Sequence, residues 1–355
     1  MCRHQSFFSH CTSDVLVVTI AKLTSLLLLA ATALATPLPL RLLSWNLRYD
    51  SKPDSIPISE TIATLPASIP TDQDVTYYSS PQEAPWSTRR IAVAQEVSFT
   101  QPTIIGFQEA LTRQVHDLSD LFGDSYSWVG VGRDDGVRAG EYEAIFWRND
   151  TLELLECDTF WLSPTPFKPS KFPGVGCVRT ATRALFRPLT PRGRNFTVIC
   201  THWDHQSDPQ RQLAASLILY RAAYEVCHHR GPVFVLGDFN SPSTGPDCGG
   251  YSIMTGLRGP VQIPADFHKK YATAEEKSRL FVDVANATEP VNRSGHHATF
   301  TGFERWEKMD LKRIDFVMAM GTAWSARRYR VGENWWDQGR LASDHRPVWV
   351  DIVVV

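Results

Sequence analysis

The sequence predicts an α/β fold in which helices pack on β-sheet, and two observations carry this prediction. Apolar runs of strand length recur along the chain, and some, such as residues 232–236, are apolar throughout, as expected of strands buried on both faces. Amphipathic segments of helix length, such as residues 87–100, lie between these runs. Because helices that alternate with strands cover the faces of a sheet, the chain is expected to form layers of both.

Composition limits the classes of function. The 355 residues are 43% hydrophobic and include 11 Trp, which is ample for a sizeable core. The formal net charge of −2 provides no global basic field that would hold nucleic acid non-specifically. A nucleic-acid substrate is therefore not favoured, although a local basic groove stays open.

The N-terminus has the features of an export signal. Lys22 precedes an apolar run from Leu23 to Leu34, and Ala33-Leu34-Ala35 fits the small-x-small pattern of a cleavage site. The run is short for a membrane span. An uncleaved signal anchor is the alternative, because the n-region is long, from Met1 to Lys22, and contains a second apolar patch at Val15 to Ile20. We expect residues 1–35 to be a signal peptide and residues 36–355 to be secreted without a stable membrane anchor.

Two further features agree with export. Acceptor sequons for N-glycosylation begin at Asn149, Asn195, Asn286 and Asn292. Five cysteines follow residue 35, and an oxidising compartment would allow disulfides among them. We expect Cys157 to pair with Cys177, because the two flank one loop rich in Pro and Gly, and Cys200 to be a buried free thiol.

The first third of the mature chain alternates between strand and helix. Residues 41–47 are expected to form a strand that ends near Asn46, and residues 103–107 a second strand that ends at Gln108-Glu109. Residues 51–86 are rich in Pro, Ser, Thr and Asp, which indicates a surface insertion. The expected helices are residues 87–100 and 111–122.

The middle of the chain is β-rich. The expected strands are residues 127–131, 142–148, 152–160, 180–187 and 195–201. The loop between the first two of these strands is dense in Gly and charge, so it is either a hairpin turn or a substrate loop. As a substrate loop it would present Arg133 and Tyr142 to the ligand.

The last part of the chain completes the layers. Its expected elements are a helix at 207–226, a strand at 232–236, a loop at 241–264, short helices within 265–279, and strands at 298–303, 312–320 and 348–355. Asp315 lies among apolar neighbours in one of these strands and needs a partner, because burying an unpaired carboxylate is costly.

Polar side chains recur where the expected strands end. They are Asn46, Glu109, His202, Asp204, Asp238, Asn240, Asp315, Asp344 and His345. Residues i and i+2 of a strand point the same way, so Asp238 and Asn240 are expected to face one spot. Gly-Asp-x-Asn before Ser-Pro is also good turn chemistry, and that interpretation stays open. Carboxylates, amides and imidazoles together best serve metal-assisted attack of water on a phosphoester.

The order of these motifs resembles the endonuclease/exonuclease/phosphatase superfamily, the deoxyribonuclease I-like fold. The matching segments are Trp45-Asn46, Gln108-Glu109, Thr201-His202-x-Asp204, Gly237-Asp238-x-Asn240, Arg313-Ile314-Asp315 and Ser343-Asp344-His345. The resemblance implies a four-layered α/β/β/α sandwich with two mixed, mostly antiparallel sheets flanked by helices. Within the superfamily, Gly140-Glu-Tyr and His202-Trp-Asp-His are most similar to a secreted or bacterial-type branch of poorly defined substrate. The insertion at 51–86 departs from that branch.

The resemblance also implies roles for single residues. Glu109, with Asn46 and Asp344, would hold Mg²⁺ or Mn²⁺. His345 would be the catalytic imidazole oriented by Asp315, and Asp238 would activate or position the water, so the base is either Asp238 or His345. Asn240 would hold a phosphate oxygen and His202 would contact the scissile phosphate. Further contacts to substrate are expected from Arg133, Tyr142, Asp204 and His205.

These observations predict a secreted, divalent-metal-dependent hydrolase of phosphomonoesters or phosphodiesters. The expected substrate is a phosphorylated small molecule, including sugar and lipid phosphoesters, and a monomer is expected. Two alternatives stay open: an extracellular endonuclease on DNA or RNA, and a non-catalytic carbohydrate- or phosphate-binding protein on the same scaffold.

Overall fold

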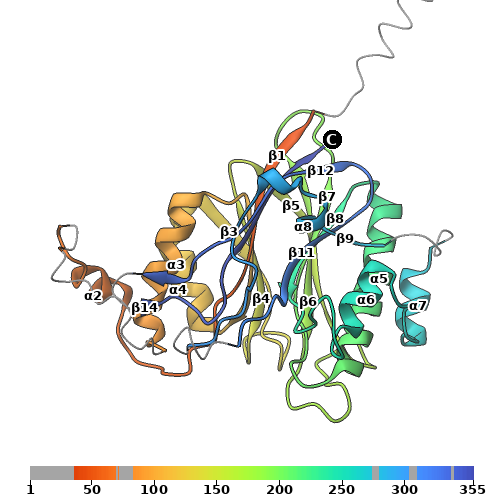
Figure 1. Ribbon diagram of the computed structural model, residues 1–355, viewed down its shortest axis with the longest axis horizontal. Helices are drawn as coiled ribbons and strands as arrows, with labels where there is room; N and C mark the ends of the chain where they lie inside the picture. Colours follow the sequence, from red (N-terminus) through yellow and green to blue (C-terminus); the bar gives the residue numbers. More distant parts are fainter. Residues whose placement is uncertain (1–35, 69–70, 72–82, 274–279, 304–309, 337–339) are drawn as a thin grey trace, which may run out of the picture.

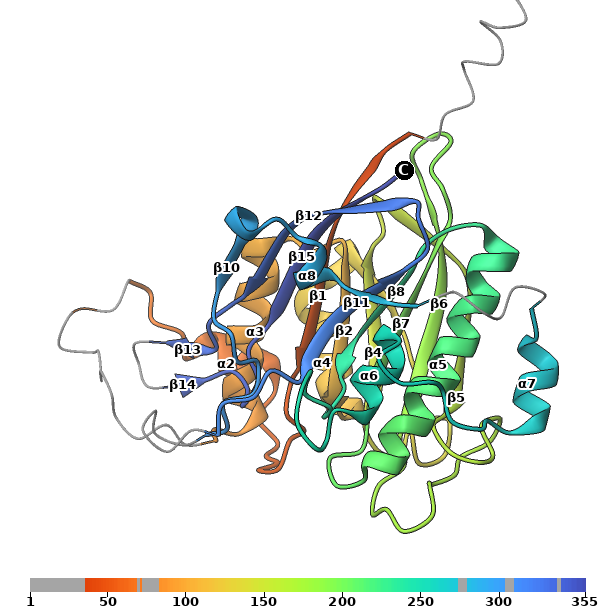
Figure 2. The same ribbon diagram turned by 45° about the vertical axis from the view of Figure 1, so that its right-hand side comes forward.

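Two β-sheets pack face to face at the centre of the molecule, and helices cover their outer faces (Figures 1 and 2). The computed structural model describes residues 36–68, 71, 83–273, 280–303, 310–336 and 340–355. The expected signal peptide, residues 1–35, lies outside this part of the chain. The four layers confirm the predicted α/β/β/α sandwich.

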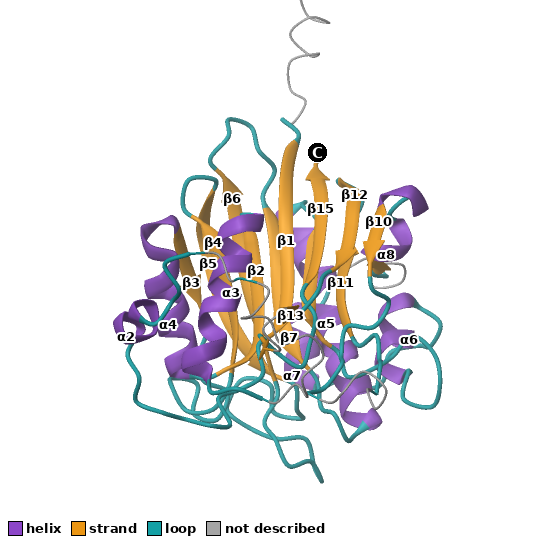
Figure 3. Cartoon of the chain, turned by 60° about the vertical axis from the view of Figure 1, so that its left-hand side comes forward, coloured by secondary structure: helices purple, strands orange, loops and turns teal. Residues whose placement is uncertain are grey.

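The first sheet contains the first and last long strands of the described chain side by side (Figure 3). Its strand order is β10 (Arg293–Gly295), β12 (Trp324–Val331), β15 (Val348–Val354), β1 (Leu38–Asn46), β2 (Ile104–Ala110), β4 (Tyr142–Arg148) and β3 (Tyr126–Val129). Strand β1 runs antiparallel to β15 and parallel to β2. The helices on this side are α2 (Ile58–Ala63), α3 (Trp86–Thr100) and α4 (Thr112–Phe122), with the 3₁₀ turn η1 (Gly123–Ser125).

The second sheet carries the long helix of the fold on its outer face. Its strand order is β5 (Leu152–Trp161), β6 (Thr180–Pro188), β7 (Phe196–His202), β8 (Val233–Asp238), β11 (Asp315–Met320) and β9 (Val282–Asp283). The remaining elements are α5 (Asp208–His229), α6 (Gly249–Thr255), α7 (Ala265–Tyr271), α8 (Val284–Ala287), η2 (Pro290–Asn292) and the short pair β13 (Trp335–Trp336) and β14 (Arg340–Leu341). Within the described residues no helix is both long and apolar enough to cross a bilayer.

Because side chains alternate along the strands, they form three apolar interfaces: one between the two sheets and one between each sheet and its helices. The same alternation sets the direction of the side chains at the strand ends. On β1, Leu40 and Leu42 face the other sheet, whereas Leu43 and Trp45 face the helices. On β8, Phe234 and Leu236 likewise belong to the core between the sheets. Because alternate residues share a face, the polar residues that end these strands point into the space between the sheets.

Several expected elements differ from the structure. Residues 298–303 do not form a strand; Phe300 makes only isolated bridges to Lys312 and His345, because no neighbouring strand extends the pairing. The strand expected at 312–320 begins at Asp315. The loop expected at 241–264 contains α6, the insertion contains α2, and β12 was not expected.

The expected disulfide is also absent from the structure. Cys157 and Cys177 are both free, as is the buried Cys200. Cys157 lies inside β5, four residues before the strand ends, whereas Cys177 follows the loop at the rim of the central cavity. The two residues therefore flank a loop in sequence without forming its two closing positions in space.

Candidate active site

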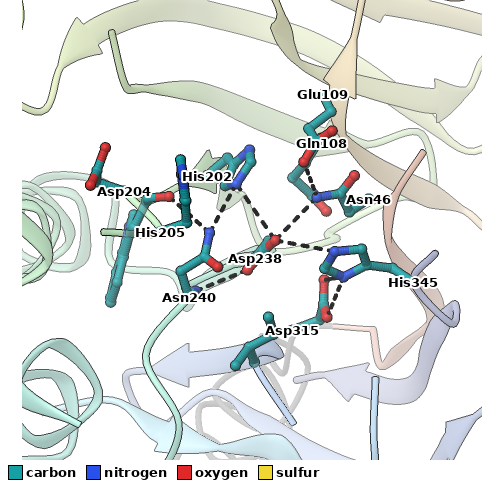
Figure 4. Close-up of polar contacts among 12 residues, drawn as sticks. Asn46, Gln108, Glu109, His202, Asp204, His205, Asp238, Asn240, Asp315 and His345 are labelled. Carbon is teal, nitrogen blue, oxygen red and sulfur yellow. Dashed lines mark hydrogen bonds and ion pairs between the residues drawn. The ribbon is translucent and has the colours of Figure 1, made fainter. Parts of the chain in front are cut away.

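Three polar residues form one row across the end of the second sheet. In the strand register His202 of β7 pairs with Asp238 of β8, and Asp238 pairs with Asp315 of β11. All three continue the side-chain rows that face the other sheet, and all three are buried. The ends of three neighbouring strands therefore place two carboxylates and an imidazole together (Figure 4).

The first sheet contributes Asn46 and Glu109 from the opposite side. The Asn46 amide donates to Glu109 Oε1 at 2.9 Å and to Asp238 Oδ2 at 3.1 Å, so it joins carboxylates of both sheets. Glu109 reaches this position through a bulge. The register between β2 and β4 shifts after Phe107, and Glu109 has φ +61°, a left-handed conformation that costs a non-glycine residue roughly 1 kcal/mol or more. Regular alternation would have turned Glu109 toward the helices with Phe107.

His345 lies on the loop before β15, and hydrogen bonds hold both its ring and its backbone. Its Nδ1 is 2.9 Å and 3.1 Å from the two carboxylate oxygens of Asp315, and the Trp45 indole donates to its backbone carbonyl at 3.0 Å. Burial alone would lower the pKa of His345, but the charges of Asp315 and Asp238 outweigh it and raise the pKa to about 10. His345 is therefore an imidazolium at neutral pH.

Asp238 is the residue at the centre of the site. Burial, together with the charge of Asp315, raises the pKa of Asp238 to about 7. Its Oδ2 is 3.6 Å from His345 Nε2 and 3.5 Å from His202 Nε2, and its Oδ1 accepts from the backbone N–H of Asn240 at 2.9 Å. Asn240 has φ +45°, so the Asp-x-Asn segment is a turn and part of the site at once.

His202 has the opposite protonation state from His345. Burial, and then the nearby guanidinium groups of Arg179 and Arg133, hold the pKa of His202 well below its usual value. The Asn240 Nδ2 lies 3.1 Å from His202 Nε2 and 3.0 Å from the carbonyl of Trp203. An amide nitrogen only donates, so His202 Nε2 accepts and the neutral ring carries its proton on Nδ1, 3.9 Å from Glu141 Oε2.

Carboxylates gather at the site, and their oxygens are the kind of ligand that a hard divalent cation prefers. Single ligand atoms of Glu109, His202 and Asp238 lie within 4.8 Å of one another. Those of Asp238, Asp315 and His345 are equally close, but this second group contains the ion pair of His345 with Asp315. Burial would raise the pKa of Glu109, but the Asn46 amide and the charge of His345 outweigh it and lower the pKa, so Glu109 stays ionised. Asp344 borders the same cavity. Oxygen donors of this kind suit Mg²⁺ or Mn²⁺.

A cavity of about 760 Å³ opens over the row and shows which predicted residues surround one space. Its lining includes most of the predicted residues, namely Glu109, His202, His205, Asp238, Asn240, Asp344 and His345. Asn46 and Asp315 lie behind this lining and orient Asp238 and His345. The structure does not bring Arg133, Tyr142 and Asp204 to the cavity wall.

Each of those three residues supports the wall from behind. The Arg133 guanidinium pairs with Glu141, and the Tyr142 hydroxyl donates to the carbonyl of Val137 at 3.1 Å. Asp204 Oδ1 accepts from two backbone N–H groups of the loop that carries His205, each at 2.9 Å. The loop between β3 and β4, which is dense in Gly and charge, is therefore mainly a structural turn. Glu141 is the residue that it contributes to the cavity wall.

Sequence reasoning missed Arg48, Glu141 and Arg179, which all line the cavity. Glu141 and Arg179 immediately precede β4 and β6. In an antiparallel sheet the start of one strand lies beside the end of the next, so both ends of the strands had to be searched. That signal was available in the sequence.

Known structures share this arrangement of layers. A protein of the endonuclease/exonuclease/phosphatase family from Bacteroides thetaiotaomicron superposes with a TM-score of 0.67 at 25% identity, covering 91% of this chain and 97% of that one. A mannosyl-6-phosphatase from the same organism gives 0.66 at 24% identity, covering 88% and 99%. TDP2 from D. rerio in complex with a single-strand DNA product gives 0.55 at 14% identity, covering 88% and 98%.

Sequence comparison gives the family directly. None of the curated protein sequences compared with this chain is significantly similar to it. The family model described as "Endonuclease/Exonuclease/phosphatase family" matches residues 43–345, which include every predicted metal-binding and catalytic residue. The chain therefore belongs to the endonuclease/exonuclease/phosphatase family and is a hydrolase of phosphoesters.

Proposed function

We propose that this hydrolase is secreted, depends on a divalent metal ion, and cleaves a small or exposed phosphate ester by attack of water. The observation that carries the proposal is that carboxylates and imidazoles from both sheets, those of Glu109, His202, Asp238 and His345, line one cavity. His345 is protonated and Asp238 has a pKa of about 7, so one acid and one base are both available at neutral pH. The similar fold of a mannosyl-6-phosphatase supports a phosphate ester of this size.

The metal would be held by Glu109 and Asn46, with Asp344 and Asp238 beside them. When bound, Mg²⁺ or Mn²⁺ supplies neutralisation of the phosphate charge. The carboxylate cluster fits this role because its oxygens face one cavity, and Glu109 accepts hydrogen bonds only from the Asn46 amide and the Tyr49 backbone among the described residues. No cation of the described protein hydrogen-bonds Glu109.

The proton states favour Asp238 over His345 as the base. His345 is charged at neutral pH, so its Nε2–H serves as a donor to a phosphoryl oxygen, and Asp315 holds the ring in place. Asp238 can accept the proton of the attacking water, because a pKa near the working pH is the most effective for general base catalysis. His202 and Asn240 border the same space and position the phosphate.

The charges on the cavity wall favour a small substrate over nucleic acid. Arg211 pairs with Asp247 at 2.5 Å, Arg48 pairs with Glu83 at 3.3 Å, and Lys312 pairs with Asp310. A polynucleotide backbone needs cations that are free to pair with successive phosphates. These three lining cations already have carboxylate partners.

Secretion is part of the proposal. Residues 1–35 would direct export, residues 36–355 would form the catalytic domain with the insertion at 51–86 at its surface, and the chain would act as a monomer. The side chains of Asn149, Asn286 and Asn292 are exposed, so a glycan could be attached to each without moving the core.

The test is ester hydrolysis by the purified mature protein with Mg²⁺ or Mn²⁺, and with EDTA. Inorganic phosphate is measured for monoesters, p-nitrophenol for bis-p-nitrophenyl phosphate, and the cleaved products themselves for phospholipid and DNA. The substrates are a sugar phosphate, a phospholipid, bis-p-nitrophenyl phosphate, and single- and double-stranded DNA. Turnover of a small ester that needs metal and is lost in Asp238→Asn supports the proposal. Asp351→Asn is the matched control, because Asp351 pairs with Arg41 and Arg328 away from the cavity. A preference for DNA would favour the nuclease, and binding without turnover would favour the non-catalytic protein.

A further inference from the structure

One side of the cavity carries polar groups that the proposed hydrolysis does not use. Glu141, Arg179 and His205 all line the cavity beyond His202. They come from three places: the residue before β4, the residue before β6 and the loop after β7. The contacts among these residues show which atoms they present to a ligand.

Arg179 is a buried guanidinium that fixes the ring of His205. Its side chain is 4% exposed, and its Nη2 lies 3.2 Å from His205 Nδ1. Arginine only donates, so His205 Nδ1 accepts, and the neutral ring carries its proton on Nε2. His205 is exposed and lines the cavity, and no described residue bonds its Nε2. The ring therefore offers one defined N–H donor to a ligand.

Glu141 offers the complementary acceptor. Its Oε2 pairs with the Arg133 guanidinium, and Arg179 Nη1 lies 4.0 Å from the same oxygen. No described residue donates to its other oxygen, Oε1. Arg133 therefore holds this carboxylate by a hydrogen bond, the charge of Arg179 lies beside it, and one acceptor oxygen is left over.

The charges of this group cancel. Arg133 and Arg179 are balanced by Glu141 and by Asp204, whose Oδ2 is 3.9 Å from Arg179 Nε. A second phosphate placed here would meet the carboxylate of Glu141, and an apolar group would leave both a donor and an acceptor unpaired, which is costly. Hydroxyl groups can donate to Glu141 and accept from His205. A polyhydroxylated group fits where an anion or a hydrocarbon does not.

The distance from the reacting phosphate suits a substrate of monosaccharide size. Arg179 leads into β6, which neighbours β7 and is two strands from β8, the strand of Asp238. Neighbouring strands are about 4.8 Å apart, so Arg179 and His205 lie roughly 5–10 Å from Asp238 along the second sheet. A sugar ring joined to the scissile phosphate spans such a gap.

We propose that Glu141 and His205 bind hydroxyl groups of the substrate's alcohol, with Arg179 as the residue that positions both. The substrate is then a phosphate ester of a polyhydroxylated alcohol such as a sugar. This inference rests on the proposed function and names its substrate class.

The test compares two phosphate esters of the same ring size, one with hydroxyl groups and a ring oxygen and one with neither. We would measure kcat and KM for a hexose 6-phosphate and for cyclohexylmethyl phosphate, which has the same ring size without hydroxyls. The wild type should prefer the hexose phosphate. His205→Ala should lower kcat/KM for the hexose phosphate about three- to tenfold more than for the cyclohexyl ester, mainly through KM, because one uncharged hydrogen bond is lost. Arg179→Gln should act in the same direction by releasing His205.

His228→Ala is the matched control. His228 is exposed near the far end of α5, where it bonds the carbonyl of Tyr224, and its removal should leave both rates unchanged. Equal rates on the two esters in the wild type would overturn the inference and leave the hydrolase standing. Equal losses on both esters in His205→Ala would do the same. Turnover of diesters or DNA alone would also overturn it, whereas inactivity on every phosphoester would refute the proposed function itself.

Discussion

Replacing Asp315 by asparagine removes one charge from the site and leaves its shape almost unchanged. Asp315 lies 2.9 Å from His345 Nδ1, and both side chains are buried. At about 3 Å and an effective dielectric constant of about 20, one charge pair amounts to roughly 5 kcal/mol, or about four pKa units. The pKa of His345 is about 10 with Asp315 ionised, so it should fall to about 6 in Asp315→Asn.

The predicted consequence is that the alkaline limb of the pH–rate profile shifts to lower pH. His345 acts as a donor only while protonated, so a pKa of about 6 leaves roughly one molecule in a hundred active at pH 8, a loss of about 10²-fold in kcat. The stability that this pair gives the metal-free protein should be fully present below the ordinary histidine pKa of 6.5 and lost as pH rises through about 10. The variant should lack that loss.

Two measurements check this prediction independently. NMR titration of the histidine ring carbons in metal-free protein with EDTA gives the pKa of His345 directly, with His345→Gln to assign its signal. The pH dependence of kcat with Mg²⁺ gives the functional limb. A pKa of His345 within one unit of the wild-type value in Asp315→Asn would refute the reasoning, as would an alkaline limb that does not move.

Three further predictions concern the metal, the core and the strand contact beside the site. Mg²⁺ at a hundred times its Kd should raise the unfolding free energy of the wild type by about 2.7 kcal/mol, and Glu109→Gln should lose most of this gain in thermal unfolding; an equal gain in the variant would exclude Glu109 as a ligand. Burial would raise the pKa of Glu225, but Arg221 and Arg183 outweigh it and lower the pKa, so its stabilisation is present above the ordinary pKa of 4.5 and lost as pH falls below it. Glu225→Gln should therefore cost about 3–5 kcal/mol in urea unfolding at pH 7, against under about 1 kcal/mol for the exposed Glu153→Gln, and similar costs would contradict this. In Gly237→Ala the new Cβ would lie 2.2 Å from the Thr201 carbonyl oxygen, so the variant should lose about 1–3 kcal/mol of unfolding free energy together with activity. A crystal structure of the variant with β7 and β8 at unchanged separation would count against this prediction.

Alternation along single strands was enough to predict the centre of the site. Asp238 and His202 end apolar strands whose buried faces are evident from the sequence, so their directions followed from the period of two. The same rule failed for Glu109, which depends on a bulge and a left-handed backbone that no local motif announces. Glu109 was singled out because it follows an apolar strand, and its role as a metal ligand stays a prediction that the resemblance to a family implies.

The wall of the cavity was harder to predict, because it depends on which strand neighbours which. Glu141 and Arg179 immediately precede β4 and β6, and only antiparallel pairing places those starts beside the ends of β2 and β7, which carry Glu109 and His202. Arg133 was expected to contact substrate, yet its charge is used to hold Glu141. The charge density of a loop shows that it has partners but does not show whether those partners are protein or ligand.

The pairing of β1 with β15 makes assembly of the site a late event in folding. The Trp45 indole and the His345 carbonyl that it contacts are 300 residues apart in sequence. At a synthesis rate of about 5–20 residues per second, His345 leaves the ribosome roughly 15 to 60 s after Asn46. During that interval the edge of β1 that later accepts β15 has no native partner, and such edges attract other strands. The nascent chain is therefore inactive and prone to mispairing until its C-terminal strand arrives.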